Sequence, residues 1–208
     1  MNVLLINGSP NEKRCSFTAL SEIANEFEPL SITSEIVHIG KAPVRGCVAC
    51  MGCMKSNNGH CVFDDDITNS LIDKMNAADA IIIASPVYYS GIAGSLKCFL
   101  DRAFWAGRGL DNKLAASVIS SRRAGSIAAF DEINHYYLKS NMHVVGSTYW
   151  NEVHGFSAKD VAQDLEGLQT LRTLAKNMAW LLKCIEIADK SGLSRPEYES
   201  VITTNFIR

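Results

Sequence analysis

The stretch Met1-Asn-Val-Leu-Leu-Ile-Asn-Gly-Ser-Pro10 decides the fold, and a polar loop continues it as far as Thr18. Residues 3–6 form a short run that is apolar on both faces, which is typical of a parallel strand covered on both sides. Residues 17–27 then carry apolar side chains at helical spacing, with Ser16 or Thr18 as the expected N-cap. A buried strand that passes through a polar turn into a helix predicts the first β-α unit of an open α/β sheet.

The same pattern of strand and helix repeats along the chain. Residues 80–84, Ala-Ile-Ile-Ile-Ala, are apolar throughout, so we expect this strand to lie in the centre of the sheet. The alternation predicts a doubly wound parallel sheet with helices on both faces. The remaining expected elements are strands at 34–39, 114–119 and 143–145 and helices at 65–75, 95–104, 127–138 and 165–187.

Length and composition are those of one globular domain. The chain has 208 residues, of which 47% are hydrophobic and 20% charged, and its net charge of −2 gives no sign of a nucleic-acid or anionic-membrane partner. We expect a single domain at 1–188, including a cysteine-rich loop at 45–64, and a polar tail at 189–208 that could serve as an oligomer arm. The N-terminus has no basic leader and no segment reaches the ~20 apolar residues of a membrane span, so a cytoplasmic protein is expected.

The polar loop after the first strand has the character of a phosphate site. It offers the hydroxyls of Ser9, Ser16 and Thr18, and the free N–H groups of the following helix favour an anion. The loop lacks both the Gly-x-Gly-x-x-Gly of dinucleotide domains and the Gly-Lys-Ser/Thr of P-loops, so a monophosphate such as that of FMN suits it better. An ordinary β-α turn with a good N-cap would show the same pattern, and the loop alone does not decide between the two.

Two further loops follow strands that end at the same edge of the sheet. Tyr88 and Tyr89 come after the strand at 80–84 and offer flat apolar surface for an isoalloxazine ring. Residues 120–125, Ser-Ser-Arg-Arg-Ala-Gly, come after the strand at 114–119; the serines can bond the flavin pyrimidine, and an arginine can stabilise negative charge near N1 of the ring. A core position for Tyr89 and a solvated surface position for the arginine pair are the plain alternatives. The predicted FMN site comprises Ser9, Asn11, Ser16, Phe17, Thr18, Pro86, Val87, Tyr88, Tyr89, Ser90, Gly91, Ser120, Ser121, Arg122, Arg123 and Gly125.

Four cysteines stand close together in the pattern Cys47-x-x-Cys50-x-x-Cys53-x7-Cys61. Thiolates at such short spacings can ligate a [4Fe-4S] cluster, because one loop can then wrap several of its corners. The last gap of seven residues, with Val62 after it, differs from the bacterial ferredoxin pattern. Zinc, redox-active thiols and a metal-free packing role remain alternatives for these four residues. The three other cysteines, Cys15, Cys98 and Cys184, lie on expected helices and are interpreted as packing residues.

Several unconnected motifs together resemble one family. The stretches Ile6-Asn-Gly-Ser-Pro10, Ser85-Pro-Val-Tyr88, Gly94-Ser-Leu-Lys-x-x-Leu-Asp-Arg102 and Met142-x-Val-Val-Gly146 resemble the NADPH-dependent FMN reductases of the flavodoxin superfamily, over about residues 1–186. The cysteine loop is most similar to that of the iron-sulfur flavoproteins within that family. The resemblance implies a flavodoxin-like five-stranded sheet of order 2-1-3-4-5, tightly bound FMN, and homodimers or homotetramers that complete the flavin pocket across subunits.

These features favour an FMN-dependent oxidoreductase with small-molecule partners. Its electrons would come from NAD(P)H or a ferredoxin-like donor and would pass to a quinone, a flavin, an aromatic acceptor or oxygen. The reaction belongs to flavin N5, so no side chain is assigned as a catalytic acid or base. A [4Fe-4S] cluster would divide the two electrons of the flavin into single steps. The alternatives are a flavodoxin-like electron-transfer protein without a substrate of its own and a redox-sensing module built on the cysteines.

Overall fold

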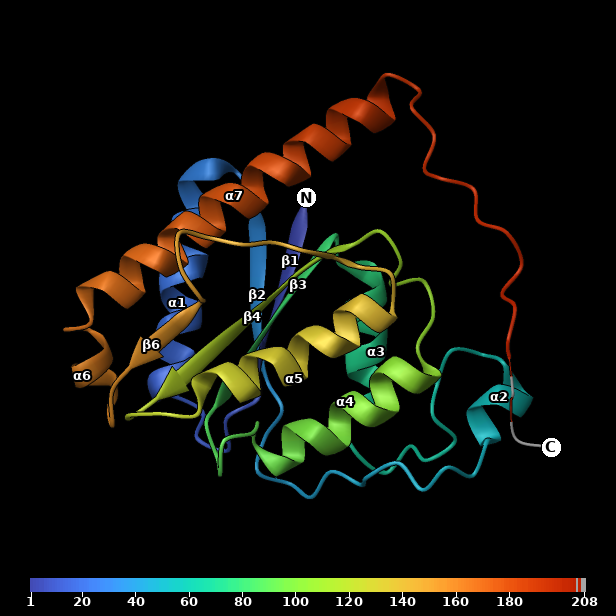
Figure 1. The fold of residues 1–208 in the computed structure, drawn as a ribbon, viewed down its shortest axis with the longest axis horizontal. Helices are drawn as coiled ribbons and strands as arrows, with labels where there is room; N and C mark the ends of the chain where they lie inside the picture. The colour runs from blue at the N-terminus through green and yellow to red at the C-terminus, as the bar shows by residue number, and fades with distance from the viewer. Residues whose placement is uncertain (205, 207–208) are drawn as a thin grey trace.

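The computed structural model describes residues 1–204 and 206, and its centre is a parallel β-sheet (Figure 1). The strands lie in the order β2-β1-β3-β4-β5, which confirms the predicted order 2-1-3-4-5. A further short strand, β6, also pairs with β4. The strands are β1 (Asn2–Asn7), β2 (Thr33–His38), β3 (Ala80–Pro86), β4 (Leu114–Ser121), β5 (His143–Val144) and β6 (Glu152–His154).

Helices cover both faces of the sheet, as the alternation of elements predicts. The helices α1 and α7 pack against one face, and α3, α4 and α5 pack against the other (Figure 1). None of the helices in the described part of the chain is long and apolar enough to cross a membrane. The helices are α1 (Cys15–Phe27), α2 (Gly52–Ser56), α3 (Thr68–Ala77), α4 (Gly94–Ala106), α5 (Ser126–Lys139), α6 (Ala158–Val161) and α7 (Leu165–Lys190), with a 3-10 turn at Glu28–Leu30.

Alternate residues of each central strand enter different cores. In β1, Leu4 and Ile6 pack in the core below α3, α4 and α5, whereas Val3 and Leu5 pack in the core below α1 and α7. All four side chains are buried. A strand with both faces covered needs apolar residues at every position, and this explains why β1 and β3 read as unbroken apolar runs.

The sheet edge next to β4 is divided, whereas the sequence predicts one strand at 143–145. β5 pairs with the start of β4, and β6 pairs with its end. Between them the chain leaves the sheet, and Asn151 fills the gap: its backbone carbonyl accepts a hydrogen bond from Ile119 N at 2.9 Å, and its Nδ2 donates to Ser117 O at 3.1 Å. The short segment that forms β6 has no run of apolar residues, so the hydrophobic pattern does not predict it.

The starts of two helices also differ from prediction. The N-cap of α1 is Arg14 rather than Ser16 or Thr18, and the Thr18 hydroxyl donates to the Arg14 carbonyl at 3.2 Å. α3 begins at Thr68, later than the predicted 65. The Asp66 carboxylate lies just before the helix and accepts the N–H of its first residue, Thr68, at 3.0 Å. At the other end of the chain, α7 continues to Lys190, whereas the predicted helix ends at 187.

Candidate functional site

A cavity of about 250 Å³ opens at the C-terminal edge of the sheet. Ligands of open α/β sheets bind at this edge, where neighbouring connections pass to opposite faces. Most of the wall is formed by the loop after β1, the loop after β3, and the end of β4 with the loop that follows it. The chain after β6 completes the wall. The lining residues are Ser9, Asn11, Arg14, Cys15, Ser16, Pro86, Val87, Tyr88, Ser120, Arg122, Gly155 and Phe156.

The loop after β1 is held in shape by its own polar groups. Asn7 Oδ1 accepts the Ser9 N–H at 3.1 Å, Ser9 Oγ accepts the Asn11 N–H at 3.1 Å, and Asn7 Nδ2 donates to Glu12 O at 2.9 Å. The His38 ring Nε2 lies 2.7 Å from Ser9 O. These bonds fix the backbone of the loop before any ligand arrives, so a bound group would meet a preformed surface.

The N-terminus of α1 points an uncapped first turn at this cavity. No side chain caps the helix and its first turn carries no acid, so its N–H groups remain available to an anion. Ser16 lies in this turn, buried, with its hydroxyl 3.0 Å from the Ser120 hydroxyl. Two arginines, Arg14 and Arg122, line the cavity, and no carboxylate does so within the described residues. This combination of donors, positive charge and hydroxyls fits a phosphate monoester.

The loop after β3 forms a tight turn over the cavity. Tyr88 and Gly91 exchange backbone hydrogen bonds of 2.9 and 3.0 Å, and Tyr89 and Ser90 between them both have positive φ, 51° and 61°. Tyr88 lines the cavity, whereas the Tyr89 side chain is fully exposed and therefore does not occupy a core position. The Glu132 carboxylate holds the far side of the turn by accepting the Ile92 N–H at 3.1 Å.

Gly125 supports this turn from the loop after β4. It has φ 90°, and a Cβ at this position would lie 2.9 Å from Ser90 Oγ and 3.0 Å from Ser90 Cα. Neither Gly125 nor Ser90 lines the cavity; they pack against each other behind the residues that do. Both residues belong to the predicted FMN site, and the structure gives them a supporting position.

The structure thus brings together part of the predicted FMN site. The other part lies outside the cavity lining and comprises Phe17, Thr18, Tyr89, Ser90, Gly91, Ser121, Arg123 and Gly125. Ser121 is buried and bonds to His154 Nδ1 at 3.0 Å instead. Four further residues line the cavity but were not predicted from the sequence: Arg14, Cys15, Gly155 and Phe156. The Arg14 guanidinium lies 5.7 Å from the Phe156 ring centroid, so these two lining residues also contact each other. The sequence did not predict β6. A strand that ends at 154 would have placed Gly155 and Phe156 at the C-terminal edge of the sheet, where ligands bind.

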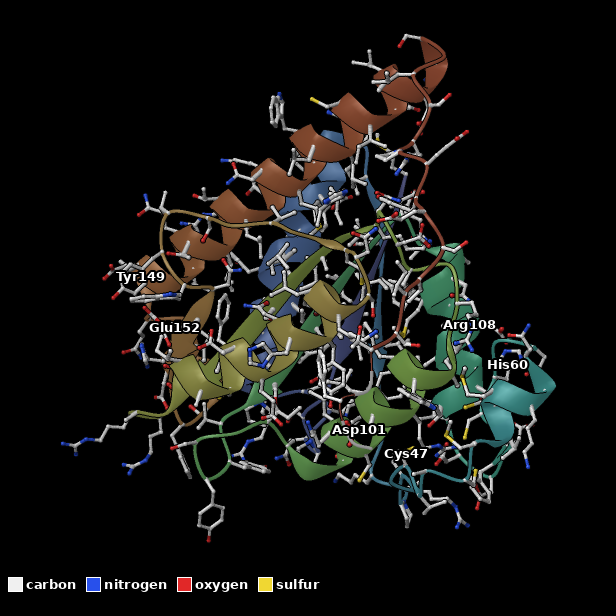
Figure 2. All side chains as sticks on the ribbon, turned by 45° about the vertical axis from the view of Figure 1, so that its right-hand side comes forward. Cys47, His60, Asp101, Arg108, Tyr149 and Glu152 are labelled. Carbon is white, nitrogen blue, oxygen red and sulfur yellow. The ribbon has the colours of Figure 1, made fainter. Side chains whose placement is uncertain are left out.

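The four cysteines of the predicted metal site lie around a second hollow, at the C-terminal end of α4. Cys47, Cys50, Cys53 and Cys61 all line it, together with apolar side chains and the guanidinium of Arg102. The enclosed space is about 20 Å³, and Cys47 and Cys50 are exposed at its rim. Figure 2 shows Cys47 in the loop beside α2, on the opposite side of the molecule from Tyr149 and Glu152.

The arrangement of these cysteines bears on the kind of group they could hold. A single zinc ion requires its sulfur ligands to converge on one point at about 2.3 Å. Among residues 1–204 and 206, no three His, Cys, Asp or Glu side chains are arranged to hold one metal ion. A [4Fe-4S] cluster takes one thiolate ligand at each of its four corners. The four cysteines that line this one hollow supply that number of thiol donors.

The fold is that of the flavodoxins. A flavodoxin from the domain Archaea superposes with a TM-score of 0.58 at 14% identity, covering 88% of this chain and 99% of that one. A crystal structure of RosB with bound 8-demethyl-8-formylriboflavin-5′-phosphate superposes with a TM-score of 0.68 at 13% identity, covering 99% of this chain and 92% of that one.

Comparison of sequences defines the family. The model of the NADPH-dependent FMN reductases matches residues 1–156, and the chain belongs to that family. It is 31% identical over 195 residues to an iron-sulfur flavoprotein of Methanocaldococcus jannaschii, covering 89% of this chain and all of that protein. It is 32% identical over 196 residues to an iron-sulfur flavoprotein of Methanosarcina thermophila, covering 89% of this chain and 97% of that protein.

Proposed function

We propose that the protein is an FMN-dependent oxidoreductase that also carries a [4Fe-4S] cluster. The observation that carries the proposal is the cavity at the end of β1, where an uncapped helix N-terminus meets two arginines and no lining carboxylate. FMN, when bound, supplies hydride and single-electron chemistry at its ring, and the protein binds and orients it. Ser9, Arg14 and Ser16 would hold the phosphate, and Tyr88 and Arg122 would contact the ring system; all five line the cavity.

The two sites stand apart within one chain. The flavin cavity adjoins the loop that leads into α4, whereas the cysteine hollow is lined by residues near the C-terminal end of α4. α4 has 13 residues and is therefore about 20 Å long. Figure 1 shows α2 and its loop at the far end of α4 from β6. Because the two sites lie toward opposite ends of this helix, we propose a homodimer or homotetramer in which the hollow of one chain meets the flavin of another.

The C-terminal tail supports the same proposal. After Lys190 the described chain has no helix or strand, and Arg195 and Tyr198 return to contact Asn112 in the loop before β4. Apolar side chains in the tail, such as Val201 and Ile202, are exposed. Exposed apolar groups on an extended segment suit contact with a neighbouring subunit.

NAD(P)H or a ferredoxin-like protein would supply the electrons, and a quinone, a flavin, an aromatic compound or oxygen would receive them. Exposed apolar side chains line the cysteine hollow, namely Val48, Met51, Val62 and Trp105. Exposed apolar groups suit contact with another protein, which in the proposed oligomer is the neighbouring subunit.

Anaerobically purified protein tests this function directly. We expect flavin absorption in the wild type, with about four iron and four sulfide per chain. Cys61→Ser should lose the iron and keep the FMN, and Cys184→Ser, on α7 outside the hollow, should keep both. Reduction by NADPH with turnover of menadione would support the reductase. Reduction by ferredoxin without turnover of menadione or another small-molecule acceptor would favour an electron-transfer protein. A chain that binds no FMN would contradict the whole proposal.

A further inference from the structure

Arg102 is a buried cation directly beneath the cysteine loop. It lies on α4 with only 2% of its surface exposed. Its Nε donates to Cys61 Sγ at 3.3 Å and its Nη2 to Phe63 O at 2.7 Å. Its Nη1 donates to Arg45 O at 3.2 Å and also pairs with Asp66. Every bonded nitrogen of this side chain thus points into the loop that carries the cysteines.

The oxygen contacts of Arg102 account for its structural role. Arg45 O and Phe63 O lie at the two ends of the cysteine loop, so one guanidinium ties these ends to α4. The buried carboxylate of Asp66 balances the charge, as a buried cation requires. The loop would be held in this way without any contact to a cysteine.

The contact with Cys61 adds something different, because it brings a permanent positive charge and an N–H donor to a candidate ligand sulfur. Arg stays protonated in proteins, so this positive charge is permanent. A hydrogen bond from a cation to a ligand thiolate draws negative charge away from that sulfur. Hydrogen bonds to sulfur and nearby charges are among the factors that set the reduction potential of an iron-sulfur cluster.

We propose that Arg102 is a positioning residue that fixes Cys61 as a cluster ligand and raises the reduction potential of the cluster held by Cys47, Cys50, Cys53 and Cys61. The inference rests on the proposed cluster. A raised potential makes the cluster a better acceptor from a one-electron donor.

The pair Arg102 and Asp66 provides two changes of opposite electrostatic sign. Arg102→Lys keeps a charge but loses the Nε–H and the fork that reaches the sulfur and both loop ends, so reduction should become harder. Asp66→Asn removes a negative charge from the same buried pair, so reduction should become easier. A purely structural role would loosen the loop in both variants and would not produce opposite shifts.

Arg108 is the matched control. It follows the same helix, its Nη1 donates to the carbonyls of Trp105, Ala106 and Gly107, and its Nη2 lies 3.5 Å from Met54 Sδ. It therefore touches the same loop without touching a cysteine. Arg108→Lys should leave the cluster potential unchanged.

The experiment is an EPR-monitored redox titration of the anaerobic holoprotein, with iron and FMN content measured for each variant. We expect the equilibrium constant for cluster reduction to fall about tenfold in Arg102→Lys, which is 59 mV for one electron. Asp66→Asn should shift it in the opposite direction.

The outcomes separate the two proposals. A wild type that contains FMN but no iron overturns the proposed cluster and the role of Arg102 with it. If the wild type contains iron but Arg102→Lys has the wild-type cluster potential, the role of Arg102 alone is overturned. The same holds if the cluster potential shifts in the same direction in Arg102→Lys and Asp66→Asn. If Arg102→Lys does not assemble the cluster, Asp66→Asn decides: a raised potential supports the proposal, and an unchanged one overturns it.

Discussion

Gly8 offers the sharpest test of the phosphate loop, because the structure leaves no room for a side chain there. A Cβ at Gly8 would lie 2.5 and 2.8 Å from the two δ carbons of Leu96 and 2.9 Å from Ala84 O. Leu96 is fully buried, and the Ala84 carbonyl accepts the Gly8 N–H at 2.8 Å as part of the backbone link to β3. Neither neighbour can withdraw freely, so Gly8→Ala must displace the start of the loop itself.

The magnitude follows from the kind of strain. Extra atoms in a well-packed core cost about 1–3 kcal/mol. For a domain of this size each 1 kcal/mol shifts Tm by about 2–4 °C, so Gly8→Ala should lower Tm by about 2–12 °C. The displaced loop carries Ser9 and leads to the first turn of α1, so FMN should bind at least tenfold more weakly, which is about 1.4 kcal/mol. Thermal denaturation of the apoprotein and a fluorescence titration with FMN measure the two effects separately.

Gly94→Ala is the control for this change. Gly94 begins α4, and no atom lies within 4 Å of a Cβ placed on it. Alanine there should leave FMN binding unchanged and should not lower Tm, since alanine favours a helix over glycine. If Gly8→Ala binds FMN and melts like the wild type, the β1 loop is not the close-packed cradle that the distances describe.

The other predictions use neighbouring residues that the structure places differently. Arg122→Gln should weaken FMN binding about tenfold or more, because a charged donor is lost from the cavity, whereas Arg123→Gln should have little effect. Isothermal titration with FMN measures both affinities, and equal losses in the two variants would show that the cavity is not the FMN site. Tyr88→Leu should lower FMN affinity and Tyr89→Leu should not, since only the first lines the cavity, and equal effects in a fluorescence titration would contradict this placement. Burial alone would raise the pKa of Asp66, but hydrogen bonds from Thr68, Arg45 and Arg102 lower it below the ordinary value. A lowered folded pKa gives stability that is present above the unfolded pKa of about 4 and is lost as pH falls through the folded value. In urea unfolding, the free energy of unfolding of the wild type should therefore exceed that of Asp66→Asn at pH 6, and the difference should shrink below about pH 4. A difference that stays constant with pH would contradict the lowered pKa of Asp66.

Much of the fold could be predicted because its strands are buried on both faces. β1 and β3 must be apolar at every position, and this gives unbroken runs that few other elements produce. β5 and β6 have two and three residues and lie at an edge, so the hydrophobic pattern carries little information about them. The first depends on pairing with Leu114 and Ala115, which are distant in the sequence.

The candidate site was predictable only where local sequence determines position. Ser9 and Asn11 belong to a loop whose own hydrogen bonds set its shape. Thr18 differs, because its hydroxyl turns back to the helix backbone, which the sequence does not reveal. The role of Arg102 depends on contacts with residues 36–57 positions away, and no spacing rule connects α4 with the cysteine loop.

The divided edge beside β4 also affects how the chain behaves in contact with other chains. A long unpaired edge strand presents N–H and C=O groups to which another chain can add, which promotes aggregation. At this edge β5 and β6 offer only two and three residues, and Asn151 turns its side chain inward to Ser117. The opposite edge, β2, is six residues long. Unwanted strand addition should therefore begin at β2. The interruption between β5 and β6 protects the other edge of the sheet, and the chain after β6 also supplies Gly155 and Phe156 to the cavity.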